Sequence, residues 1–140
     1  MFLFEKIGLI LSIGIVLGTN GINVAHELGH RKKFWERMLG KILLMPAFYM
    51  HFYLEHNFGH HQNVGTHKDP ATSKINQSVF SFWITSIIGQ IVNAIRIQKT
   101  LLRKNDRIFF SIYNDFFYYQ IFQFGYLVII GSLFGSSAII

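Results

Sequence analysis

The order of apolar and polar positions divides the chain into hydrophobic stretches separated by polar segments. Residues 7–25 carry no charged side chain, and as a helix they are about 28 Å long, close to the thickness of a bilayer core. Residues 116–140 form a second uncharged stretch, rich in Phe, Tyr and Ile. We expect both stretches to be membrane-spanning helices. A cleaved signal peptide is the alternative for the first, but Glu5 and Lys6 are unlike the basic start of such a peptide.

The positions of the basic residues orient these two spans. All but one of the 13 Lys and Arg residues lie between Arg31 and Arg107, the exception being Lys6. Basic residues mark the cytoplasmic side of a membrane protein, and Arg31, Lys32 and Lys33 follow the first span directly. We therefore expect the chain to enter from outside, and the segment between the spans to face the cytoplasm.

Two further apolar stretches lie between the predicted spans. Residues 42–54 are about 20 Å long as a helix, too short to cross a bilayer, so they predict a short buried or re-entrant helix. A longer stretch begins at Ile75, carries polar residues throughout and leads into a basic cluster between Arg96 and Arg107. A crossing would place that cluster outside, against the positive-inside rule, so we expect an interfacial helix over about residues 75–100.

The composition supports a membrane protein. A chain of 140 residues has room for one domain, and 51% hydrophobic with 14% charged residues is more apolar surface than a soluble fold of this size can bury. The net charge of +6 is explained by membrane topology, because we find no basic arm or nucleic-acid motif and expect no nucleic-acid partner. We predict an all-α fold of integral membrane helices in the bilayer, with a cytoplasm-facing core that holds the histidines.

The candidate chemistry lies in the histidines. The chain has seven His and no Cys, so a metal would have to be held by imidazole and carboxylate groups. His26 and His30 belong to the segment HELGH, and the i, i+4 spacing places both imidazoles on one helix face. The same letters fit the HExxH pattern of zinc metalloproteases, with Glu27 as general base, and this remains the rival enzyme.

A second histidine segment, EHNFGHH, occupies residues 55–61. His56 and His60 repeat the i, i+4 spacing, whereas the adjacent His60 and His61 diverge by about 100° and could serve two different ions. Five clustered histidines exceed the needs of one zinc ion. The two segments together therefore favour a dinuclear site, with iron as the metal suited to oxygen chemistry.

Two carboxylates stand beside these histidines. Glu27 comes directly after His26 and three positions before His30. Glu55 comes directly before His56. Carboxylates next to a cationic metal site commonly accept hydrogen bonds from the second ring nitrogen of a ligand histidine. We expect Glu27 and Glu55 to orient the ligands in this way, with direct metal binding as the alternative.

Several neighbouring residues are expected to play structural roles. His51 lies five positions before His56, which turns it about 140° away on a helix, and His67 lies in a polar loop. We expect neither to bind metal. Asp69 and Pro70 predict an N-cap followed by proline at the first position of the next helix.

Both histidine segments resemble those of a known family. HELGHRKK at residues 26–33 and EHNFGHHQNVGTHKDPATS at residues 55–73 resemble the first two histidine boxes of the membrane-bound alkane hydroxylases. These integral-membrane diiron monooxygenases, also called alkane 1-monooxygenases, are distantly related to fatty acid desaturases. The resemblance implies a diiron site whose ligands include His26, His30, His56, His60 and His61.

The resemblance also implies an activity. Members of the family hydroxylate the terminal carbon of alkanes with dioxygen, take electrons from rubredoxin, and place the site near the cytoplasmic face below an apolar channel. A fatty acid desaturase or hydroxylase acting on lipid is the near alternative, to be separated by the product formed. The spacing and composition of this chain do not establish these properties by themselves.

The chain departs from the family pattern in one respect. The family site uses nine histidines, and the four others come from later motifs resembling NYxEHYG and HxxHH, which this sequence lacks. We therefore expect a partial domain over residues 1–140, the central piece of a longer protein, or a non-catalytic remnant. Five histidines alone should bind iron weakly or not at all unless another polypeptide completes the set. That polypeptide could be a second copy, so a homo-oligomer is left open.

Overall fold

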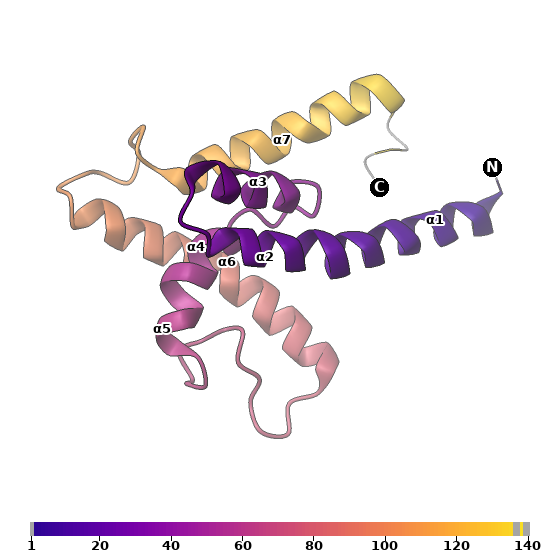
Figure 1. Ribbon diagram of the computed structural model, residues 1–140. Coiled ribbons are helices and arrows are strands. Elements are labelled where there is room, and N and C mark those ends of the chain that lie inside the picture. The colour runs from indigo at the N-terminus through magenta and orange to yellow at the C-terminus, as the bar shows by residue number, and fades with distance from the viewer. Residues whose placement is uncertain (1, 136–137, 139–140) are drawn as a thin grey trace. The chain divides into compact units, whose positions relative to one another are not determined.

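The computed structural model describes residues 2–135 and 138, and within them the chain is helical with no β-strand, as predicted. The chain forms two compact units. The first comprises Met1–Met50 and Gln120–Ile140, and the second comprises His51–Tyr119. Figure 1 labels the helices along the chain. Each unit is described separately below.

The first unit begins with one continuous helical run. This run consists of α1 (Leu3–Val16), the π-helix η1 (Leu17–Ile22) and α2 (Asn23–Gly29). None of the residues of α1 is buried, although most of them are apolar. A helix that exposes apolar side chains on all sides fits lipid better than water, because soluble helices carry a polar face. The predicted span 7–25 lies inside this run.

α3 (Phe34–Leu44) packs against α2 in the same unit. The two helices approach closely at Gly40, where an added Cβ would lie 3.0 Å from the carbonyl oxygen of Ala25 and 3.2 Å from Cβ of Leu28. The absence of a side chain at Gly40 therefore lets α3 lie directly against the helix that carries the first histidine segment.

The predicted single helix over residues 42–54 is not observed. α3 ends at Leu44, turns follow, and α4 (Phe52–Glu55) begins only after them. Pro46 explains the break, because proline has no N–H to donate and disfavours a helix through the residue before it. Phe48 then adopts a left-handed backbone conformation with φ of 55°, and the N–H of Tyr49 donates to the carbonyl of Leu44.

α7 (Asp115–Phe134) begins in the second unit and continues in the first. In the first unit its Gln123 is 1% exposed, and Gln123 Oε1 accepts a hydrogen bond of 2.8 Å from the N–H of Met50. Other side chains, such as Phe122 and Val128, are apolar and exposed. The predicted span 116–140 coincides with α7 up to Phe134, while residues 136–137 and 139–140 lie outside the described residues.

The second unit joins the second histidine segment to a long helix. The histidine segment is a short helical run of α4, the π-helix η2 (His56–His60) and α5 (His61–Asn63). A loop leads to α6 (Val79–Arg103), whose N-cap Ser78 accepts a hydrogen bond from the N–H of Ser81 at 3.2 Å. The predicted helix start at Asp69 and Pro70 is therefore wrong, since the next helix begins nine residues after Pro70.

α6 has its polar face inward. Its buried residues recur every four positions and include two glutamines, and they are Ser86, Gln90, Ala94, Gln98 and Leu102. Its exposed residues are largely apolar, as at Trp83, Ile84 and Ile88. This reverses the pattern of a soluble helix and suits a helix whose outer face meets lipid.

Three helical runs of the described part are long and apolar enough to cross a membrane. They are Leu3–Gly29, Val79–Arg103 and Asp115–Phe134. The sequence pattern had predicted spans at the first and third. The second, α6, also meets the criteria of length and hydropathy, and its predicted placement at the membrane interface stays a prediction.

Candidate metal centre

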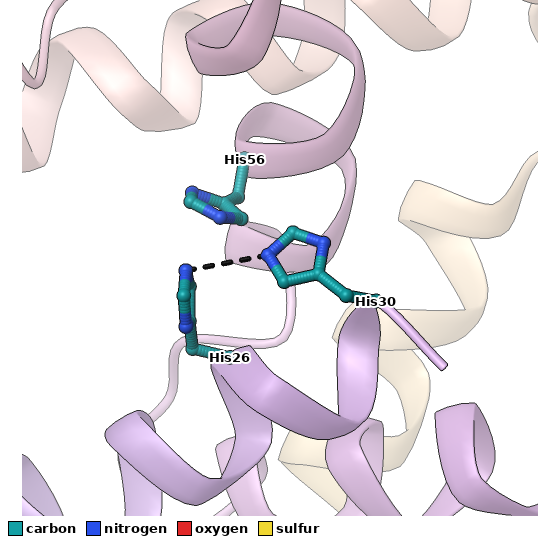
Figure 2. A group of neighbouring side chains, drawn as sticks. All are labelled: His26, His30 and His56. Carbon is teal, nitrogen blue, oxygen red and sulfur yellow. Dashed lines mark hydrogen bonds between the residues drawn. The ribbon is translucent and has the colours of Figure 1, made fainter.

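The first histidine pair lies at the end of α2. The Nε2 atoms of His26 and His30 are 3.3 Å apart, and the two rings meet edge to face (Figure 2). Two residues four positions apart lie one above the other on an α-helix, so this approach follows directly from the HELGH spacing. Both rings present the same nitrogen to the space between them.

The carboxylate of Glu27 contacts the other nitrogen of one of these rings. Glu27 Oε1 lies 3.0 Å from Nδ1 of His26. A proton held on Nδ1 by a carboxylate leaves Nε2 with a lone pair, which is the form of imidazole that binds metal. The contact therefore matches the orienting role predicted for Glu27, although its side chain is 74% exposed.

The second histidine pair is formed by different residues from those that the α-helical spacing predicts. The Nε2 atoms of His56 and His61 are 3.0 Å apart, with their rings edge to face. The ring of His60 instead stacks on that of His56 at a centroid distance of 5.3 Å. η2 is a π-helix, whose i→i+5 hydrogen bonds widen the turn, and His61 rather than His60 presents its Nε2 to that of His56.

Side-chain amides accompany the altered helical register. Asn57 Nδ2 donates to the carbonyl of Tyr53, and Asn63 Nδ2 donates to the carbonyl of Gly59, each at 2.8 Å. Each amide donates to the carbonyl four residues earlier. These carbonyls lie next to η2, where the backbone hydrogen bonds change from the i+4 to the i+5 pattern. They help to satisfy the backbone of the widened turn.

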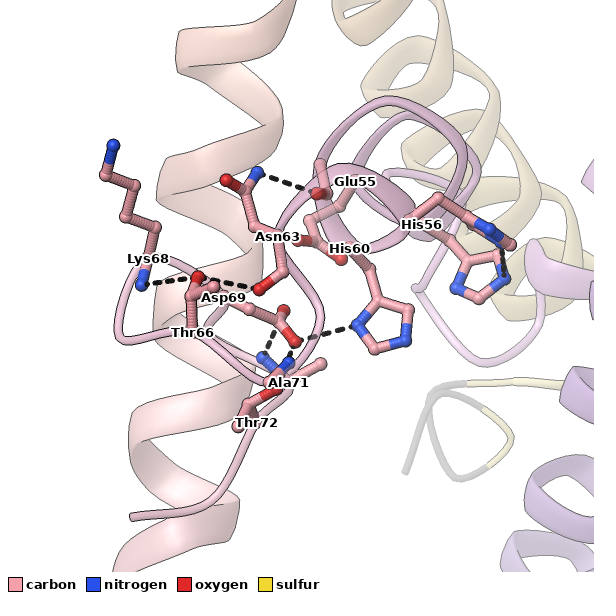
Figure 3. A network of polar contacts seen from close by, with 12 residues as sticks. Glu55, His56, His60, Asn63, Thr66, Lys68, Asp69, Ala71 and Thr72 are labelled. Atoms are coloured by element: carbon pink, nitrogen blue, oxygen red, sulfur yellow. Dashed lines mark hydrogen bonds and ion pairs between the residues drawn. The ribbon is translucent and has the colours of Figure 1, made fainter.

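His60 is held by a residue that the sequence had assigned to a helix cap. Its Nδ1 lies 2.9 Å from Oδ2 of Asp69, whose side chain is fully buried (Figure 3). Burial by itself raises the pKa of the Asp69 carboxyl. The hydrogen bonds that the carboxyl accepts from Thr72, Ala71 and His60 outweigh burial and leave its pKa below the ordinary value. Asp69 is thus an anion placed against the ring of a candidate ligand.

Glu55 has a different partner from the one predicted. Its side chain is 0% exposed, and Oε1 accepts a hydrogen bond of 3.1 Å from Asn93 Nδ2 on α6. Burial raises the pKa of the Glu55 carboxyl, and the bond from Asn93 opposes that effect. The amide of α6 thus takes the place of the imidazole partner that we expected for Glu55.

The two remaining histidines, His67 and His51, differ in burial. His67 is exposed in the loop that follows α5, as expected for a solvated residue. His51 is 3% exposed at the N-cap of α4, where burial lowers its pKa to about 4. Burial favours the neutral ring of His51 and agrees with the packing role that we expected.

The nitrogen atoms of each pair lie at hydrogen-bond distance, and the same spacing is compatible with a shared metal ion. Two imidazole nitrogens bound about 2.1 Å from one ion, at an angle of about 90–105°, lie about 3.0–3.3 Å apart. The observed separations are 3.3 Å for the first pair and 3.0 Å for the second. Nitrogen donors without thiolates suit iron, zinc or copper. Each unit therefore carries a pair of side chains that fits one metal ion.

The fold and the two histidine pairs together define the class, an all-α membrane protein with a candidate metal centre. A sequence model of the fatty acid desaturase family matches residues 6–140, and the chain belongs to that family. Membership implies a metal cofactor.

Individual relatives make the resemblance more specific. The chain is 38% identical over 112 residues to alkane 1-monooxygenase 1 of Alcanivorax borkumensis, an alignment that covers 80% of this chain and 28% of that protein. It is 36% identical over 132 residues to alkane 1-monooxygenase of Ectopseudomonas oleovorans, covering 94% and 33%. The enzyme of that name from Pseudomonas putida is 38% identical over 112 residues, covering 80% and 28%.

These comparisons confirm the resemblance seen in the histidine segments. They also show that the chain spans a third or less of the length of these relatives. The three candidate spans, together with the alkane 1-monooxygenase relatives, support a membrane protein.

Proposed function

We propose that this chain supplies ligands to a membrane diiron monooxygenase that hydroxylates the terminal carbon of alkanes. The observation that carries the proposal is the pair of facing Nε2 atoms in each histidine segment, in a chain similar to alkane 1-monooxygenases over most of its length. The five proposed ligands are His26, His30, His56, His60 and His61. When bound, the iron would supply the activation of dioxygen.

The remaining side chains have positioning roles in this proposal. Glu27 holds the proton of His26 on Nδ1, and the π-helical register of η2 turns His60 and His61 in different directions. Glu55 and His56 are buried, whereas His30 and His61 are exposed. By the resemblance of the histidine segments, we further propose rubredoxin as electron donor and a site that faces the cytoplasm at the inner membrane.

A segment exchange tests the function directly. The matched segment of the Ectopseudomonas oleovorans enzyme is replaced by that of this chain, and the chimera is expressed with rubredoxin and its reductase in a host without alkane hydroxylases. We expect the chimera to convert n-alkanes to 1-alkanols, and the His56→Ala, His60→Ala double variant to form none. The exposed His67→Ala variant is the matched control and should keep the activity.

Other products would identify another function. Formation of a double bond in a fatty acyl chain, without alkanol, would favour the desaturase alternative. A chimera that accumulates in the membrane with iron bound but forms no oxidised product would contradict the proposal. Peptide cleavage lost in a Glu27→Gln variant would revive the zinc metalloprotease.

A further inference from the structure

The loop between α5 and α6 is built around one carboxylate. Three donors converge on Asp69, whose side chain is fully buried. The N–H of Ala71 donates to Oδ1 at 3.0 Å, while the hydroxyl of Thr72 and Nδ1 of His60 both approach Oδ2. Figure 3 shows these contacts converging on the carboxylate of Asp69. A buried carboxylate with three donors is held in one orientation.

The backbone of the same loop is held by hydrogen bonds within the loop and by a contact with α6. The N–H of Asp69 donates to the carbonyl of Thr66, and the hydroxyl of Thr72 accepts from the N–H of Gly65 at 3.0 Å. Pro70 lies against α6 at Gly89, where an added Cβ would come within 2.6 Å of the proline Cβ. The loop is therefore attached to α6 as well as to the second histidine segment.

We propose that Asp69 is a positioning residue that fixes the tautomer and orientation of His60, so that Nε2 of His60 is the metal-binding nitrogen. With the proton on Nδ1 donated to Asp69, Nε2 carries the lone pair, and it has no hydrogen-bond partner among the described residues. Carboxylates that hold a ligand histidine in this way typically raise its basicity and fix its direction. The tautomer of His60 can be tested without a metal, and only the statement that Nε2 binds metal rests on the proposed function.

The geometry predicts why asparagine cannot replace Asp69. An amide has one oxygen where the carboxylate has two, so its NH2 group must face a donor in either orientation. If the NH2 group takes the place of Oδ1, it faces the N–H of Ala71. If it takes the place of Oδ2, Nδ1 of His60 must accept a hydrogen bond instead of donating one. In the second case the ring proton moves to Nε2, and the metal-binding lone pair is lost.

The first test measures the tautomer of His60 without any metal. The detergent-purified chain is labelled with 15N-histidine, and NMR is recorded above the ordinary pKa of histidine, with the His60 signals assigned by their loss in a His60→Ala variant. We expect Nδ1 protonated in the wild type and a shift toward protonated Nε2 in Asp69→Asn. Protonated Nε2 in the wild type would overturn the inference.

The second test measures metal affinity by titration with Fe(II) under anaerobic conditions. We expect Asp69→Asn to lower the affinity about 10- to 100-fold. Thr72→Val keeps the carboxylate and should lower the affinity by a smaller factor, while His67→Ala, in the same loop but exposed, should leave it unchanged. Equal losses in Asp69→Asn and His67→Ala would contradict the inference.

The two tests separate this inference from the proposed function. If the wild-type chain binds no metal, the proposed role of the histidines fails, whereas the tautomer measurement still decides the role of Asp69. If Asp69→Asn does not fold, the wild-type tautomer and the Thr72→Val variant decide it.

Discussion

At the scale of single residues, Gly59 determines how closely the second histidine segment approaches α6. A Cβ at this position would lie 2.7 Å from Asn93 Nδ2, 2.8 Å from Ile97 Cδ1 and 2.9 Å from Glu55 Oε1. Real Cβ atoms do not occupy such positions without displacing their neighbours. The glycine therefore permits both the close packing of η2 on α6 and the hydrogen bond between Asn93 and Glu55.

We expect Gly59→Ala to destabilise the protein by about 1–3 kcal/mol, because the added methyl group overpacks the contact with α6. The displacement should also disturb the alignment of His56 with His61 and weaken metal binding. Thermal unfolding in detergent, followed by circular dichroism, measures the first effect, and metal titration measures the second.

Gly125→Ala is the matched control for that variant. Gly125 also lies within a helix, α7, but a Cβ there meets nothing within 4 Å. Alanine at an open helical position should be neutral or slightly stabilising, by up to about 1 kcal/mol. If both variants unfold at the same temperature, the contact at Gly59 does not have the importance given to it here.

At the scale of elements, local pattern predicted the first histidine pair but not the second. An α-helix places His26 next to His30, and the sequence alone contains that information. In the second segment the π-helical register pairs His56 with His61, and the packing that accompanies it includes Asn93, 38 positions from Glu55 along the chain. A sequence pattern that covers only a few residues cannot predict a contact with a residue so far along the chain.

Two other elements show the same division between local and distant causes. Pro46 carried a local signal for the break after α3, which the continuous apolar stretch over residues 42–54 concealed. Asp69 followed by Pro70 has the letters of a helix start, but the carboxylate is used by His60 and by its own loop. The role of Asp69 depends on the fold of the loop, and no spacing rule predicts it.

The topology of α6 leads to a prediction at the same scale. If α6 lies at the interface, both of its ends should be reached from the cytoplasmic side. The chain has no Cys, so single cysteines at Ser81 and at Lys99 can be labelled in intact cells and in inverted vesicles with a membrane-impermeant thiol reagent. We expect both positions to react in inverted vesicles and neither in intact cells.

Opposite accessibility of the two positions would show that α6 crosses the membrane. A cysteine at Ser12 within α1 is the control, since a residue inside a span should be unreactive from both sides. A crossing would agree with the length and hydropathy of α6. It would contradict the prediction of an interfacial helix, which was based on the basic cluster between Arg96 and Arg107.

At the scale of the whole molecule, each unit contributes one helical histidine pair and one carboxylate that contacts a histidine of that unit. Glu27 contacts His26 in the first unit, and Asp69 contacts His60 in the second. The apolar surfaces of α1, α6 and α7 account for the membrane setting, because they leave few polar faces for water. The central claim is that both histidine segments hold metal.

Iron binding by the detergent-purified chain tests this claim most directly. Fe(II) is titrated into the wild type and the His26→Ala, His56→Ala and His67→Ala variants, and bound metal is counted by elemental analysis. Because each segment holds a facing pair of Nε2 atoms but only part of the ligand set, the account predicts weak but measurable iron binding by the wild type and by His67→Ala. The affinity should be lowered at least about tenfold in each of the other two variants. Absence of iron binding by the wild type, or binding that neither His26→Ala nor His56→Ala weakens, would contradict it.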